Sequence, residues 1–135
     1  MGDGDTKVEL ARRGFEAVQR GELEPIARLF ADDVRRHGGE PSAPGACRSR
    51  EDALAVIRAA IERGAVGELV DAVDAGDQVV VVMRPAPSVG RGGTDPVANL
   101  TTFRDGKVVE MVHFPDPAEA LAAARRPATG RPDRL

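Results

Sequence analysis

Cysteine, tyrosine and tryptophan are almost absent from this chain, and long apolar runs are absent altogether. The single cysteine, Cys47, excludes an intrachain disulfide and a cysteine-based zinc site. Four Phe residues are the only aromatics, so the core must be mostly aliphatic and no pocket can contain a tyrosine hydroxyl. The longest apolar run, residues 79–83, is far too short to cross a bilayer, and no membrane partner is expected.

The chain also lacks a large excess of positive or negative charge. The net charge is -3, from 19 basic and 22 acidic residues, which gives no electrostatic reason to expect a nucleic-acid partner. The first five residues are acidic and lack an apolar stretch, so they do not form a signal peptide, and we expect a cytoplasmic protein. Two histidines without metal-ligand spacing predict no metal site, and no motif indicates a cofactor.

Helical periodicity is present in four segments. Residues 5–20 carry apolar side chains at helical spacing, and a short helix follows with Pro25 in its first turn. A third helix is predicted from the capping residue Ser49 to Gly64. Asp116, followed by a proline, predicts the start of the last helix.

One strand is predicted between the second and third helices, and four more follow the third helix. The predicted strands cover residues 34–37, 66–75, 78–84, 96–104 and 107–114. The dipeptide Asp105-Gly106 predicts a two-residue hairpin turn between the last two. Helices first and a strand meander afterwards indicate an α+β fold, with a curved antiparallel sheet wrapped by three to four helices around a pocket.

The domain organisation is simple. Residues 1–126 are predicted to form one domain, and residues 127–135, rich in Pro, Gly and Arg, a disordered tail. The Pro- and Gly-rich residues 85–95 predict a long, mobile loop.

Four short motifs, in this order and spacing, resemble the nuclear-transport-factor-2-like superfamily, which includes ketosteroid isomerases and SnoaL-like polyketide cyclases. They are residues 21–23, 29–34, 48–53 and 103–111, within a resemblance that spans residues 8–124. The resemblance implies a cone-shaped fold with a hydrophobic pocket for a small apolar molecule. It also implies a homodimer built on the outer face of the sheet.

The same resemblance argues against one activity of the superfamily. Ketosteroid isomerases use a tyrosine on the first helix, an aspartate base after the first strand and a protonated aspartate on the fourth strand. The matching positions here are Gly14, the neighbourhood of Gly38, and Thr101. All three functional residues are missing, so this chain is not expected to be a ketosteroid isomerase of the known mechanism.

His113 is the first candidate for acid–base chemistry. Strand alternation places Val109, Met111 and His113 on one face, and in the superfamily the Met111 face looks into the pocket. His113 would then act as a general acid, a general base or a hydrogen-bond donor. The alternative is a structural histidine bonded to a backbone group near the end of the strand.

His37 is the second candidate, because SnoaL-like proteins often carry a histidine after the first strand. The alternative is an exposed loop histidine, favoured by the neighbouring Arg35 and Arg36, which suggest a solvated strand. Both interpretations stay open.

A set of mostly apolar residues is predicted to bind the ligand. Two of its members, Asn99 and Thr101, would be the polar groups that orient the ligand, unless they form only cross-strand hydrogen bonds. The predicted set is Phe15, Val97, Asn99, Thr101, Phe103 and Met111.

Three functions are compatible with these features. The first is a cofactor-free isomerase, cyclase, dehydratase or hydrolase that acts on a small apolar substrate. The second is a non-catalytic module that binds a small ligand. The third is a dimeric interaction protein whose own side chains fill the pocket.

Overall fold

The computed structural model describes residues 3–40, 42–85 and 95–125. In chain order the elements are α1 (Asp3–Gln19), α2 (Glu24–Leu29), β1 (Phe30–His37), α3 (Arg50–Glu62), β2 (Glu68–Ala75), β3 (Gln78–Arg84), β4 (Val97–Arg104), β5 (Lys107–Phe114) and α4 (Pro117–Arg125). Most of the loop predicted over residues 85–95 lies outside the described residues, as does the whole predicted tail over 127–135.

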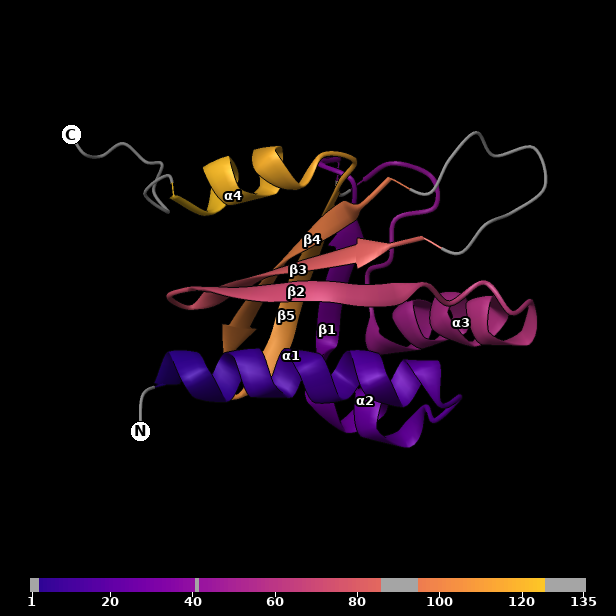
Figure 1. Cartoon of the computed structure of the whole chain (residues 1–135). Helices are drawn as coiled ribbons and strands as arrows, with labels where there is room; N and C mark the ends of the chain where they lie inside the picture. Colours follow the sequence, from indigo (N-terminus) through magenta and orange to yellow (C-terminus); the bar gives the residue numbers. More distant parts are fainter. Residues whose placement is uncertain (1–2, 41, 86–94, 126–135) are drawn as a thin grey trace.

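The five strands form one curved, open sheet in the order β1-β5-β4-β3-β2 (Figure 1). Strands β2 to β5 form the predicted antiparallel meander. Strand β1 pairs with β5 in parallel, so the sheet is mixed where antiparallel pairing alone was expected. The pairing joins segments far apart in the sequence, and local patterns carry no signal for strand direction across such a distance.

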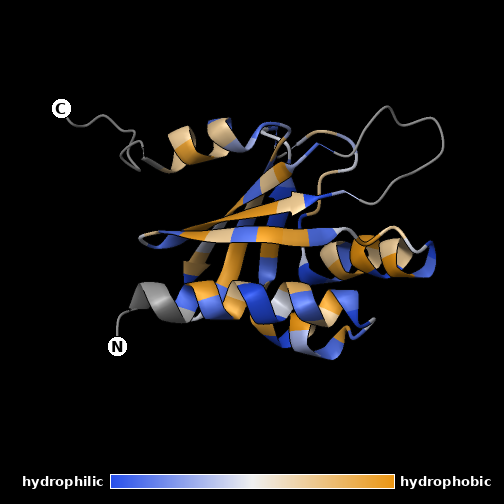
Figure 2. Cartoon of the chain, viewed as in Figure 1, coloured by the Kyte–Doolittle hydropathy of each residue, from blue (hydrophilic) through white to orange (hydrophobic). Residues whose placement is uncertain are grey.

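Helices cover both faces of the sheet. Figure 1 shows α1 and α2 on one side and α4 on the other, with α3 beside β1. On the first side an inner core forms, which includes Val79 and Val81 of β3. On the second side the neighbouring Val80 belongs to an outer core with Ala120 of α4. The continuous apolar run of β3, orange in Figure 2, is therefore covered on both faces, as its sequence predicted.

Local signals account for the ends of the elements. Ser49 caps α3, because its Oγ accepts a hydrogen bond from the Asp52 N–H at 3.1 Å. Asp116 precedes α4, and its Oδ1 accepts from the Ala118 N–H at 2.9 Å. Asp105 and Gly106 have φ values of 55° and 78°, as a type I′ hairpin turn requires. The two predicted caps and the predicted turn are thus confirmed.

Helix α4 packs on strands β3, β4 and β5 and so covers part of the outer face of the sheet. The resemblance places a dimer contact on this face, and the homodimer stays a prediction. In the described part of the chain, no helix has the length and apolar character needed to span a membrane.

Candidate functional site

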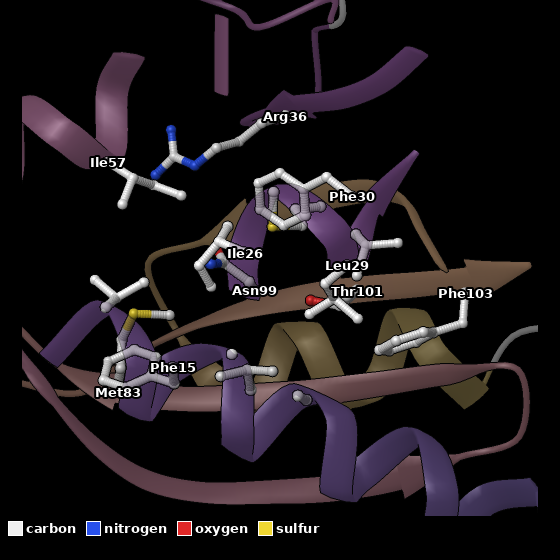
Figure 3. Close-up of a pocket in the computed structure, with 16 residues that line it drawn as sticks. Phe15, Ile26, Leu29, Phe30, Arg36, Ile57, Met83, Asn99, Thr101 and Phe103 are labelled. Carbon is white, nitrogen blue, oxygen red and sulfur yellow. The ribbon is translucent and has the colours of Figure 1, made fainter. Parts of the chain in front are cut away.

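A cavity of about 170 Å³ lies between the sheet and the helices α1, α2 and α3 (Figure 3). Its wall is mostly apolar and contains contributions from every one of these helices and from β1, β3, β4 and β5. Large apolar side chains in the wall include Phe15, Ile26, Leu29, Phe30, Ile57 and Met83. Such a wall favours an apolar occupant, because water inside it finds few hydrogen-bond partners.

Five of the six predicted ligand-binding residues line this cavity. They are Phe15, Asn99, Thr101, Phe103 and Met111. The three residues on β4 share one face because side chains alternate along a strand. Val97 does not line the cavity. It is the first residue of β4 and lies two residues before Asn99, at the end of the strand.

A bulge in β5 changes which of its residues reach the cavity. Phe103 pairs with Val108 and Thr102 pairs with Glu110, so Val109 is an extra residue with no partner position on β4. Val108 and Met111 line the cavity, whereas regular alternation predicted Val109 in place of Val108. The bulge depends on pairing between strands, which the alternation of one strand does not reveal.

His113 pairs with Asn99 across β4 and β5, so both residues project from the cavity side of the sheet. The His113 side chain is half-buried, and it is not among the residues that line the cavity. His113 therefore lies beside the cavity wall, next to Asn99.

His37 lies on the opposite face of the sheet. Its neighbour Arg36 lines the cavity, and its pairing partner Val112 packs in the outer core against α4. The His37 side chain is only 6% exposed, and its Nε2 lies 2.7 Å from Oε2 of Glu110. The two predicted catalytic histidines thus project from different faces of the sheet.

Arg36 is a lining residue that the sequence interpretation missed. Its backbone is held on both sides, by pairing with Met111 of β5 and by two hydrogen bonds to Cys47, with N···O distances of 3.0 and 2.8 Å. The spacing of Arg36 from the fully buried Val34, two residues earlier, was the signal that could have placed it on the inner face. Burial raises the pKa of the Cys47 thiol, and the positive charge of Arg36 opposes this rise.

Two further polar side chains face the cavity from β4. Oδ1 of Asn99 is buried and has no hydrogen-bond partner within the described residues. Thr101 is 6% exposed and lies two residues after Asn99, on the same face of β4. A buried acceptor without a donor costs about 1 to 3 kcal/mol, and a ligand that donates to Asn99 would remove this cost.

The wall offers few groups for acid–base or metal chemistry. Its described residues include neither a histidine nor a carboxylate. Nor do three His, Cys, Asp or Glu side chains gather as a possible metal site anywhere in the described ranges. Gly14 and Thr101, at the positions where isomerases carry a tyrosine and an acid, both line the cavity, and Gly38 does not.

Comparisons with known proteins agree with this architecture. The sequence pattern of the SnoaL-like domain family matches residues 11–111. No curated protein matches the chain.

Solved structures with the same fold share little sequence with the chain. Bal32a, from a soil-derived mobile gene cassette, is 22% identical with a TM-score of 0.72, over 87% of this chain and 95% of that one. An NTF2-like protein of unknown function from Mesorhizobium loti is 19% identical with a TM-score of 0.69, over 86% and 95%. A candidate SnoaL-like polyketide cyclase from Jannaschia sp. CCS1 is 22% identical with a TM-score of 0.62, over 91% and 94%.

Proposed function

Since the chain belongs to the SnoaL-like domain family, we propose that it binds a small, mostly apolar molecule in the cavity between α1 and the sheet. The observation that carries the proposal is the buried Oδ1 of Asn99, an acceptor without a donor in an otherwise apolar wall. Binding sites for small molecules combine an apolar wall with a few polar groups that orient the ligand.

The size of the cavity supports a ligand of about one or two rings. Its volume of about 170 Å³ is close to that of engineered apolar cavities, roughly 150 Å³, that bind benzene. Such a volume also weighs against a dimeric interaction protein, because the side chains of such a protein would fill the pocket. The aliphatic and phenyl side chains of the wall would exclude water around the apolar part of the ligand.

Thermal denaturation with and without a panel of small aromatic and alicyclic alcohols tests the proposal. Alcohols suit the site because a hydroxyl can donate to Asn99. A ligand present at 100 times its Kd raises the free energy of unfolding by about 2.7 kcal/mol, which is readily measured as a rise in Tm.

Two phenylalanine substitutions make the test specific for the cavity. Ala11→Phe fills the space from α1, where Ala11 lines the cavity, and is expected to abolish the rise in Tm. Ala55→Phe, on the exposed side of α3, is the matched control and is expected to leave it unchanged. The proposal would be refuted by equal stabilisation of the Ala11→Phe protein, or if neither these alcohols nor carboxylic acids and amides of similar size stabilise the unchanged protein.

A second candidate function is a cofactor-free enzyme with His113 as its acid or base, of the isomerase, cyclase, dehydratase or hydrolase type. The pairing of His113 with Asn99 favours it, because a ligand bound to Asn99 lies near the imidazole. Turnover separates the two functions. A binding module does not convert its ligand, whereas an enzyme converts it and loses this turnover in His113→Ala while stabilisation by the ligand persists.

A further inference from the structure

We propose that the ligand of this cavity is an apolar monocarboxylate, and that the guanidinium of Arg36 binds its carboxylate group. The inference rests on the proposed function and names the chemical class of the ligand. It is carried by a half-buried cation in the cavity wall that has no counter-ion within the described residues.

The environment of Arg36 differs from that of the other arginines. Among arginines with described side chains, only Arg36 and Arg50 are half-buried, and the others are exposed to solvent. Arg50 has a partner, because its Nη2 lies 2.9 Å from Oδ1 of Asp32. The side chain of Arg36 makes neither an ion pair nor a hydrogen bond to any described residue. A charge that is partly removed from water without a partner is unfavourable, and an anionic ligand would compensate it.

The neighbouring thiol of Cys47 does not supply this anion. Cys47 is buried beside Arg36, and burial raises the pKa of its thiol, so the neutral thiol is the form present near neutral pH. Within the described residues the guanidinium therefore has no anionic partner, which leaves it free to bind an anionic ligand.

The position of Arg36 suits a ligand with an anionic end and an apolar body. Arg36, Met111 and Thr101 form one row across three adjacent strands, with Met111 in the middle. Neighbouring strands are about 4.8 Å apart, so Arg36 and Thr101 are separated by roughly 10 Å at their backbones. A carboxylate at Arg36 would leave the body of the ligand over Met111 and any hydroxyl group near Thr101 and Asn99.

A carboxylate fits this site better than a phosphate. Guanidinium groups bind carboxylates with two parallel hydrogen bonds, which needs one arginine and no further cation. A phosphate ester carries close to two negative charges and three acceptor oxygens, and Arg36 is the only cationic residue in the described wall. The charge of the site therefore matches a single carboxylate.

Paired ligands test the inference directly. Each pair consists of a carboxylic acid and its neutral primary amide: phenylpropionate, 4-hydroxyphenylacetate, cyclohexylacetate and octanoate, each against the corresponding amide. Ligand-observed NMR titrations at pH 7.5 give Kd values for the unchanged protein. At least one acid is expected to bind about tenfold or more tightly than its amide, because hydrogen bonds to charged groups are the stronger ones.

Two variants locate the effect. Arg36→Met is expected to remove the preference for the acid while retaining the amide, whereas Arg50→Gln, the matched control outside the cavity, keeps the preference. Thermal denaturation without ligand adds an independent readout. Arg36→Met is expected to maintain or raise the Tm, because it removes a charge without a partner, and Arg50→Gln is expected to lower it slightly.

The outcomes separate the inference from the proposed function. Amides that bind as tightly as their acids would overturn the inference and leave a neutral ligand for the cavity. An acid preference that persists in the Arg36→Met protein would also overturn it. If no acid, amide or alcohol binds, both proposals fail. The comparison of acids with amides on the unchanged protein decides the matter even if a variant does not fold.

Discussion

His37 and Glu110, 73 positions apart in the sequence, form a hydrogen bond of 2.7 Å on the face of the sheet that points away from the cavity. The Gly39 N–H donates to Nδ1 of His37 at 3.0 Å, so Nδ1 carries no proton. The neutral imidazole therefore holds its proton on Nε2 and donates it to the Glu110 carboxylate. This arrangement fixes one tautomer and links the end of β1 to β5.

Glu110→Ala is expected to lower the free energy of unfolding by about 1 to 2 kcal/mol, because it leaves the buried Nε2–H of His37 without an acceptor. This loss lies in the lower part of the usual range for an unsatisfied buried donor. The Glu110 side chain is 38% exposed, so water can partly replace its carboxylate as the acceptor. Glu110→Gln keeps an acceptor and should lose less than half as much. Urea denaturation compares the three proteins, and equal stabilities would contradict a role for the pair.

Gly67→Ala is expected to destabilise the protein by about 1 to 3 kcal/mol through overpacking. A Cβ at Gly67 would lie 2.2 Å from the carbonyl oxygen of Arg84, a backbone atom that cannot move alone. Gly38→Ala is the matched control, because a Cβ at Gly38 meets no heavy atom within 4 Å and its φ is outside the left-handed region. Denaturation midpoints check both variants, and a Gly67→Ala protein as stable as Gly38→Ala would contradict the close approach.

Gly106→Ala is expected to cost about 1 to 2 kcal/mol, because it forces an L-residue into the left-handed conformation, at a φ of 78°. Asp105→Asn, at the neighbouring position with a φ of 55°, should be nearly neutral, because asparagine tolerates this conformation. Thermal or urea denaturation measures both, and the turn geometry is contradicted if the two substitutions have the same effect.

The stability of the protein is expected to fall at alkaline pH because of Cys47. Burial raises the pKa of this thiol above its ordinary value of about 8.5, so the folded state holds the proton more tightly than the unfolded state. This contribution is complete below about pH 8.5 and is lost as the pH rises through the pKa of the folded state.

Urea denaturation from pH 7 to pH 10 measures this loss as the difference between the unchanged protein and Cys47→Ser. The difference removes the contribution of other groups that titrate in this range. Above about pH 8.5 the free energy of unfolding of the unchanged protein should fall relative to that of Cys47→Ser, and below this pH the difference should stay constant. Curves that stay parallel over the whole range would contradict a shifted thiol.

Local chemistry made much of the fold predictable from the sequence. The caps at Ser49 and Asp116 and the turn at Asp105-Gly106 each depend on residues within a few positions of one another. The alternation of β4 was equally local and correctly grouped Asn99 with Thr101 and Phe103. Features of this kind need no knowledge of the tertiary structure.

Features that depend on distant pairing were not predictable in this way. The parallel pairing of β1 with β5 puts Arg36 in the cavity wall and His37 on the opposite face, whereas the sequence left open whether His37 lies close to the pocket or in a solvated loop. A shift of one residue along a strand exchanges its two faces. Short strands rich in charged residues, such as β1, contain few apolar positions, so only the spacing from Val34 indicated which face Arg36 occupies.

The bulge at Val109 has a consequence for the chemical character of the cavity. Counted from the Asp105-Gly106 turn, an uninterrupted β5 that began with Val108 facing inward would turn every even-numbered residue toward the helices α1 to α3. Glu110 would then bring a carboxylate into the cavity, and Met111 would point to α4. Because Val109 is an extra residue, Met111 faces the cavity and Glu110 faces away from it. One additional residue therefore places a thioether in the pocket instead of a carboxylate.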